Sequence, residues 1–317
     1  MALADDDAAA TQPQSSVSTS STPSAVAPPF NVTDAEGRVV EVRDTSRIVA
    51  IGGAVTEILY AMGLGDRVIA VDQTSTYPAE VKDQPIVGYS RTLSPEGVLS
   101  VGPSLILAME GAGPRSTLDV LENASVPVVI IPDAHDAAGV VRKIKAIAEA
   151  VGEPEKGQNL AEAVQQDFDV VTSALAGVKQ RPRAVFVLSA SGGAAVVGGS
   201  DTSADAMFRL AGITNAMASI KGYKPAQDEA AMTSEPEAIV VMRDGGQVLD
   251  ADTLFSLPTF MGTPAAQNRK LLTFPGSYLL GFGPRAPHAV RDLAVALHPD
   301  VEIPELPERP WNAEPAQ

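Results

Sequence analysis

The sequence predicts an α/β protein of two lobes, each a parallel sheet covered by helices, joined by one long helix. Short aliphatic runs alternate with amphipathic helical segments, which indicates parallel sheets with helices on their faces. The alternation occurs twice, and a continuous helical pattern from Glu155 to Ala176 separates the two halves. The chain of 317 residues is long enough for two α/β lobes of ordinary size.

Composition excludes several classes of protein. Hydrophobic residues make up 45% of the chain and charged residues 20%, which is typical of globular proteins. The net charge is -16, with 23 Lys and Arg against 39 Asp and Glu, so nucleic acids and anionic lipid are poor ligands. There are 0 cysteines, which excludes disulfides and thiolate-ligated metals. No apolar run approaches the ~20 residues that cross a bilayer.

Residues 1–29 are expected to form a flexible tail. Met1 to Asp7 show neither the basic start nor the apolar stretch of an export signal, so we expect no intact signal peptide in this sequence. Thr11 to Pro29 are rich in Ser, Thr, Pro, Gln and Ala. A cleaved precursor that begins at a new Met and an ordinary disordered cytosolic tail would both have this composition.

The N-terminal lobe is expected to span residues 30–152. Its strands are short β-branched or aliphatic runs bounded by Gly, Pro or Asp, as buried parallel strands are. They are predicted at Arg47–Ile51, Arg67–Val71, Ser104–Ala108 and Pro127–Ile131. Helices are predicted at Thr56–Met62, Ser94–Ser100 and Val140–Val151, the last with Gly152 at its C-cap.

The C-terminal lobe is expected to span residues 181–300, with the connecting helix within 153–180 and a C-terminal extension at 301–317. Strands are predicted at Ala184–Leu188, Ala238–Met242 and Leu271–Phe274, and helices at Ala204–Leu210 and His288–Leu297. No Gly/Ser linker separates the halves. Because a helix flexes less than a loop hinge, we expect small motions of the lobes.

One acidic residue in each half has the same spacing to a following proline and strand. Glu96 precedes Pro103 by seven residues, and Glu229 precedes Pro236 by seven. Two exposed acids that begin similar helices would explain the spacing, since the helix dipole favours them there. A pair of acids presented to a symmetric partner would explain it as well.

Catalytic motifs are missing. There is no G-x-S-x-G elbow, H-E-x-x-H, Walker loop or G-x-G-x-x-G after a strand, so we expect that the protein is not an enzyme. His135, His288 and His298 lie far apart in sequence and have no partner at helical spacing, so we expect them on the surface.

The segment around Tyr89 is a candidate ligand site. Gly88 interrupts the local pattern, and an extended loop after it would point Tyr89 and Arg91 to the same side. A phenol, whose ordinary pKa is near ~10, ligates ferric iron as phenolate, and a neighbouring guanidinium stabilises that charge. Tyrosine is also a known axial haem ligand. A tyrosine packed in a turn beside a solvated arginine would fit the spacing equally.

Four motifs in order resemble those of the haem-binding periplasmic proteins of bacterial ABC importers. The resemblance runs from about residue 44 to 299, and its motifs are Val87–Ser100, Gly198–Met207, Gly222–Pro225, and Leu279–Arg285 with Leu297–Pro299. It implies two Rossmann-like lobes bridged by one helix, with the ligand in the cleft between them. It also implies a monomer in the periplasm that captures haem and delivers it to an ABC importer.

The resemblance also assigns roles to residues. Tyr89 would be the axial ligand of the haem iron, and Arg91 would assist the phenolate or the porphyrin. Glu96 and Glu229 would dock on the permease dimer of the inner membrane. Three cations of the second lobe would bind the haem propionates: Lys221, Lys224 and Arg243. Ordinary solvated charges on loops would give the same sequence pattern.

One departure from the family concerns the second side of the haem. Some relatives have a histidine after the first strand of the second lobe, and residues 189–193 here contain none. We therefore expect one five-coordinate ferric haem, or a sixth ligand from elsewhere. The nearest alternative retains the fold and binds cobalamin or a ferric siderophore, and a Rossmann-type enzyme is a remote one.

Overall fold

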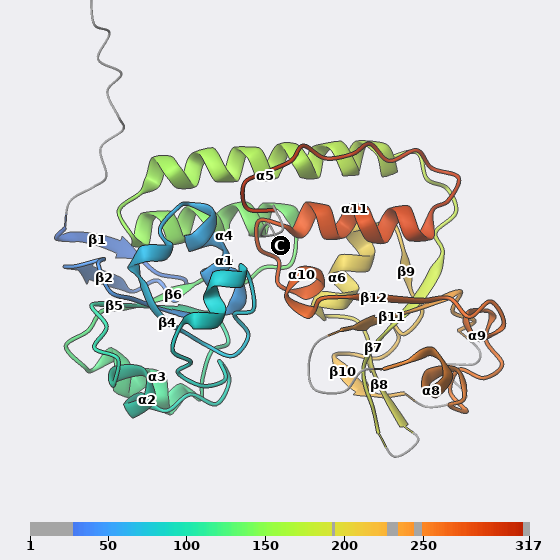
Figure 1. Ribbon diagram of the computed structural model, residues 1–317, viewed down its shortest axis with the longest axis horizontal. Coiled ribbons are helices and arrows are strands. Elements are labelled where there is room, and N and C mark those ends of the chain that lie inside the picture. Colours follow the sequence, from blue (N-terminus) through green and yellow to red (C-terminus); the bar gives the residue numbers. More distant parts are fainter. Residues whose placement is uncertain (1–27, 192–193, 227–233, 244–248, 313–317) are drawn as a thin grey trace, which may run out of the picture.

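The computed structural model describes residues 28–191, 194–226, 234–243 and 249–312. The chain forms two α/β lobes that lie side by side, and the long helix α5 (Pro154–Leu175) runs over both of them (Figure 1). This is the two-lobed architecture that the sequence predicts. Among the residues described, no helix is long and apolar enough to cross a membrane.

The N-terminal lobe is built on a parallel sheet with the strand order β4-β3-β5-β6. Its strands are almost wholly aliphatic and buried, because both faces of a parallel sheet are covered. They are β3 (Ile48–Ile51), β4 (Val68–Val71), β5 (Leu105–Met109) and β6 (Val128–Ile131). The strands expected from the sequence agree with these bounds to within one residue at each end.

Helices and a hairpin surround this sheet. An antiparallel hairpin that was not predicted from the sequence precedes it, formed by β1 (Phe30–Thr33) and β2 (Val39–Val42). The α-helices are α1 (Gly53–Ala61), α2 (Pro95–Leu99), α3 (Arg115–Glu122) and α4 (Ala137–Ala150). Two 3-10 turns are η1 (Gly65–Arg67) and η2 (Ala79–Asp83).

The sheet of the C-terminal lobe is mixed, which corrects the expectation of a wholly parallel one. β11 pairs in parallel with β7 and β12, but β8 pairs antiparallel with both β7 and β10. Only two residues separate β7 from β8, and so short a connection joins antiparallel strands. The strands are β7 (Arg183–Ser191), β8 (Ala194–Gly198), β9 (Thr214–Asn215), β10 (Tyr223–Pro225), β11 (Ala238–Met242) and β12 (Leu271–Phe274).

Helix α5 joins the lobes by packing against a helix of each, α4 in the first and α11 in the second. Its approach to α4 is close at Gly157, where a Cβ would lie 2.1 Å from the Cβ of Ala148. The remaining helices of the second lobe are α6 (Ser203–Leu210), α8 (Ala251–Phe255), α9 (Pro264–Gln267), α10 (Gly276–Leu280) and α11 (Ala286–Leu297).

Candidate functional site

The carboxyl ends of the strands meet at the boundary between the lobes. Thr76 follows β4 in the first lobe and Ser277 follows β12 in the second, and the Thr76 hydroxyl donates a hydrogen bond to Ser277 Oγ over 2.9 Å. Open α/β sheets bind ligands outside the carboxyl ends of their strands. This boundary is therefore the candidate site.

A buried ion pair crosses the same boundary. Arg285 Nη2 lies 2.9 Å from Glu57 Oε2, and the two side chains are 11% and 5% exposed. The backbone N–H of Arg285 also donates to Glu57 Oε1, and its guanidinium carbon lies 3.4 Å from the centroid of the Tyr77 ring. Gly283 leaves room for this carboxylate, because a Cβ there would lie 2.9 Å from Glu57 Oε1. In the sequence, Arg285 stands out only as part of a motif, because the position of its partner Glu57 depends on the tertiary fold.

Tyr89 lies in a loop that crosses the carboxyl edge of the first sheet. The Gly88 carbonyl accepts from the N–H of Gln73, just after β4, and the Ser90 carbonyl accepts from the N–H of Gly113, beyond β5. Since β3 lies between β4 and β5, the loop passes over the centre of the sheet. Tyr89 is an exposed residue, with 40% of its surface accessible, so a ligand can reach it from outside the protein.

The expected extended conformation of this loop is wrong. The Thr92 N–H donates to the Tyr89 carbonyl over 2.8 Å, which makes Tyr89 to Thr92 a turn. Gly88, at φ 116, directs the chain into this turn. Arg91 is exposed, and its Nη1 would lie 3.9 Å from a Cβ placed on Gly111, which follows β5. Arg91 therefore extends along the carboxyl edge of the sheet, although from a turn and not from a strand-like segment.

A buried carboxylate supports the floor of this edge. Asp72, which directly follows β4, is fully buried and accepts the N–H of Gly52 and the N–H and hydroxyl of Thr74. The Thr74 hydroxyl oxygen accepts the N–H of Gly53, the first residue of α1. Multiple donors offset the desolvation of this charge. They also hold the ends of β3 and β4 in fixed positions beneath the Tyr89 loop.

The three cations expected in the second lobe lie at different places. Arg243 follows the carboxyl end of β11 and is exposed at the lobe boundary. Lys224 lies on β10 at the level of Val197 and is also exposed. Lys221 precedes β10 and forms an exposed ion pair with Asp201, with Nζ and Oδ2 3.0 Å apart. The structure thus brings Arg243 to the boundary and leaves Lys221 on the surface nearer the amino end of the sheet.

A pocket of about 970 Å³ opens between the lobes. Its cationic lining is Lys82, Arg243 and Arg285, and none of Tyr89, Arg91, Lys221 and Lys224 lines it. His288 and Tyr278 also line it. Burial lowers the pKa of His288, whereas burial and the charge of Asp292 raise the pKa of Tyr278. Both therefore stay neutral at neutral pH, and the charge of this wall comes from the cations and Asp292.

Lys143 forms a second charged cluster at the lobe boundary, together with Asp133 and His135. The side chain of Lys143 is fully buried and its Nζ lies 2.7 Å from Asp133 Oδ1 and 3.5 Å from the carbonyl of Phe282 in the other lobe. Burial raises the pKa of Asp133, but the hydrogen bond from His135 and the charge of Lys143 outweigh it and lower the pKa to about 2. His135 also packs its ring on Phe282, with centroids 4.9 Å apart. Asp133 is therefore ionised at neutral pH, and the contacts of Lys143 and His135 with Phe282 brace one lobe against the other.

The two predicted docking acids differ in what the structure describes. Glu96 is exposed in the first turn of α2, which Ser94 caps by accepting the N–H of Gly97 over 3.0 Å. Helix α2 lies on the side of the lobe far from α5 (Figure 1). Glu229 lies outside the described residues.

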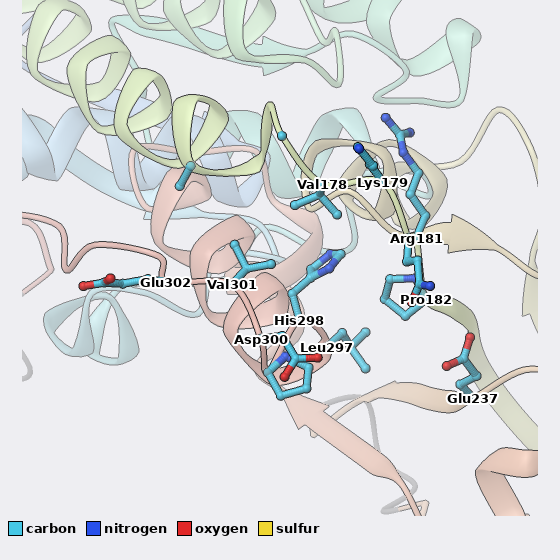
Figure 2. A pocket seen from close by; sticks show the side chains of 14 residues that line it. Val178, Lys179, Arg181, Pro182, Glu237, Leu297, His298, Asp300, Val301 and Glu302 are labelled. Carbon is cyan, nitrogen blue, oxygen red and sulfur yellow. The ribbon is translucent and has the colours of Figure 1, made fainter.

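Figure 2 shows another pocket, of about 730 Å³, near the ends of α5 and α11. Cations and acids both line it, including Lys179, Arg181 and Glu237. Its wall includes Pro182, which directly precedes β7, so it lies at the amino end of the sheet and away from the lobe boundary. His298 in this wall is only 5% exposed, with Nε2 3.0 Å from the Ala211 carbonyl oxygen, which corrects the expectation of a surface histidine.

Comparisons with solved structures agree with this geometry. The apo form of the periplasmic haem-binding protein RhuT from Roseiflexus sp. RS-1 is 33% identical, with a TM-score of 0.76 over 81% of this chain and 99% of that chain. The periplasmic haem-binding protein BhuT, solved in complex with two haems, is 37% identical, with a TM-score of 0.74 over 79% of this chain and 97% of that chain.

Relatives known by sequence are also binding proteins. YvrC of Bacillus subtilis (strain 168), an uncharacterised ABC transporter substrate-binding lipoprotein, is 29% identical over 276 residues, or 86% of each chain. A vitamin B12-binding protein of Yersinia pestis (strain Pestoides F) is 27% identical over 223 residues, covering 70% of this chain and 78% of that protein. The model of the family named periplasmic binding protein matches residues 48–278. The chain therefore belongs to the periplasmic binding protein family.

Proposed function

We propose that the protein captures haem between its lobes in the periplasm and delivers it to an ABC importer, with no chemistry performed on the porphyrin. The observation that carries the proposal is Tyr89, an accessible phenol on a loop over the centre of the carboxyl edge of a parallel sheet. Such an oxygen can ligate ferric iron as phenolate. The haem-binding proteins RhuT and BhuT, with their high structural similarity, support the same ligand.

Cations near the lobe boundary supply the second part of the proposal. Arg91 extends toward Gly111 along the same edge and would stabilise the phenolate or a ring substituent. Arg243, at the end of β11, would meet a propionate from the opposite lobe. Lys224 and Lys221 would contribute at longer range, with Lys221 first giving up its exposed pair with Asp201. Exposed pairs are weak, so that exchange costs little.

Ferric haem titrated into the protein and followed by absorption tests the ligand directly. The matched pair of variants is Tyr89→Phe and Tyr60→Phe, since Tyr60 lies in the last turn of α1, at the end of that helix remote from the carboxyl edge. We expect Tyr89→Phe to lose the tyrosinate spectrum and to bind haem about tenfold or more weakly, because loss of an outer-shell partner alone weakens metal sites ~10–100-fold. Tyr60→Phe should behave as the parent protein. A protein that binds no haem at all contradicts the proposal.

The same titration counts the bound haem molecules. BhuT was solved with two haems, whereas we propose one haem here because residues 189–193 offer no histidine to a second iron. A break point near one equivalent supports that count. A break near two equivalents would show that the missing histidine does not limit the stoichiometry.

Cobalamin is the second candidate, because a vitamin B12-binding protein is among the relatives. Cobalamin has its cobalt enclosed by its own ligands and does not need the Tyr89 phenol. Titration with cyanocobalamin distinguishes the two: saturable binding that Tyr89→Phe leaves unchanged would favour cobalamin over haem.

We further propose that Glu96 and Glu229 dock the protein on the importer permease. Glu96 is exposed on the side of its lobe far from α5, where a partner can approach without displacing the connecting helix. Glu96→Lys should abolish delivery of bound haem to the reconstituted importer while leaving the haem titration unchanged. Glu162→Lys, an exposed position on α5, is the control. Equal delivery by both variants would remove Glu96 from the docking surface.

A further inference from the structure

The segment from Val301 to Asn312, here called the strap, leaves α11 in the second lobe and returns along α5 to the lobe boundary (Figure 1). It is held at both ends and in the middle. Near its start the Pro304 carbonyl accepts from Arg291 Nε of α11 over 2.7 Å. Near its end the Trp311 carbonyl accepts from the Tyr77 hydroxyl of the first lobe over 2.8 Å.

The middle anchor is a buried ion pair with the connecting helix. Arg309 Nε and Nη2 donate to the two carboxylate oxygens of Asp167 over 3.1 and 2.7 Å, and Nη2 also lies 3.4 Å from the Ala163 carbonyl. Asp167 is 1% exposed. A two-pronged bond to a buried carboxylate is strong and directional, because separation of the pair would leave the charge desolvated and unpaired.

The sequence of the strap indicates that it is stiff. Prolines recur every third residue, at Pro304, Pro307 and Pro310, and fix φ near ~-65° while disfavouring the α region in the residues before them. Burial follows the same period: Ile303 is buried, Leu306 and Arg309 are partly buried, and the prolines and the glutamates between them are exposed. A period of three is that of a polyproline II helix, which has 3 residues per turn and resists compression and bending.

Tyr77 is therefore held by two different parts of the chain. Its hydroxyl is bonded to the strap, and Arg285 of the second lobe lies against its ring while also pairing with Glu57. Any motion that widens the boundary moves Tyr77 away from α11. A stiff strap anchored at α11, at Asp167 and at Tyr77 cannot follow that motion without losing an anchor.

We propose that the strap restrains the opening of the lobes and so sets the resting width of the cleft. The restraint requires no ligand, since its anchors are all within the chain. It goes beyond the proposed function and would hold for any cargo. It also assigns a role to the C-terminal extension, which the resemblance to the haem-binding proteins did not cover.

Distance measurement between paired spin labels in ligand-free protein tests the restraint. The chain has 0 cysteines, so Val120→Cys and Met261→Cys provide unique attachment points in the two lobes, at residues that are 51% and 61% exposed. The labelled protein is compared with the same protein ending at Asp300. We expect removal of the strap to shift the distance distribution to longer values by several ångströms and to broaden it.

Point variants keep the test decisive if the shortened chain does not fold. Tyr77→Phe removes one anchor and retains the ring beneath Arg285, so it should broaden the distribution in the same direction but less. Tyr60→Phe should leave it unchanged. The proposal is overturned if Tyr77→Phe leaves the distance distribution unaltered and a second variant does so too. That second variant is the shortened chain, if it folds, or a triple variant with glycine in place of the three strap prolines. No haem enters the experiment, so its result is independent of the haem titration.

Discussion

Replacement of Arg285 by methionine should strongly destabilise the protein. The Met side chain retains the apolar contact with Tyr77 but removes the cation that lies 2.9 Å from Glu57 Oε2. Glu57 is 5% exposed and would remain as a buried charge without its partner. Removal of one partner of a buried pair costs about 3–5 kcal/mol. Because the pair joins the two lobes, this loss should loosen the contact between them.

An exposed pair of similar geometry provides the control. Arg43 Nη2 lies 2.7 Å from Glu41 Oε2, with side chains 72% and 48% exposed. Solvent already stabilises both charges, so Arg43→Met should cost less than about 1 kcal/mol. The two substitutions delete the same side chain and differ chiefly in burial and in the lobes that they connect.

Equilibrium unfolding in urea measures the difference. The chain has 1 tryptophan, Trp311, whose carbonyl accepts from Tyr77 at the lobe boundary, so its fluorescence reports on this region. With a slope of about 3 kcal/mol per molar urea, Arg285→Met should lower the midpoint by about 1 M or more, and Arg43→Met by less than about 0.3 M. Equal midpoints for the two variants would refute the argument that burial makes this interlobe pair strong.

Two further predictions concern the same boundary. Gly283→Ala places a Cβ 2.9 Å from Glu57 Oε1 and should destabilise by about 1–3 kcal/mol, whereas Gly177→Ala meets open space and should change the urea midpoint little. The lowered pKa of Asp133 stabilises the fold above its unfolded value near 4, and that contribution disappears as the pH falls toward 2. Between pH 4 and 2 the free energy of unfolding should therefore fall by about 2 kcal/mol less in Asp133→Asn than in the parent protein. Identical profiles of unfolding free energy against pH for the two proteins would contradict this.

The fold was largely predictable because its signals are local. The strands from β3 to β6 are runs of aliphatic residues bounded by turn-forming ones, and α5 has an uninterrupted helical period. The β1-β2 hairpin was missed because its strands are mostly exposed or only partly buried and contain polar residues, so no continuous aliphatic run marks them. β8 was missed because its short glycine-flanked run reads as a turn.

The site was predictable only in part because it depends on contacts between distant residues. Tyr89 and Arg91 could be singled out from their spacing and family resemblance, but their turn depends on bonds to Gln73 and Gly113, which no local pattern indicates. Glu57 and Arg285 are 228 positions apart in sequence. Glu57 lies in the apolar helix α1, where nothing marks it as a partner for a distant cation.

The concentration of contacts at the boundary limits how a partner could open the cleft. The Glu57–Arg285 pair joins α1 to the start of α11. Both of these helices lie nearer to α5 than α2 does, the helix that carries Glu96 (Figure 1). A permease that binds Glu96 would therefore apply its force far from the contacts that join the lobes, where a given force exerts the largest torque on the boundary. It would nevertheless have to favour the open form by at least the free energy with which the Glu57–Arg285 pair and the other contacts hold the lobes together, since a partner shifts an equilibrium only by its difference in affinity for the two states. The free energy with which the importer binds the protein must therefore match the free energy that holds the two lobes together. A protein weakened at Arg285 should release its cargo without full engagement of the importer.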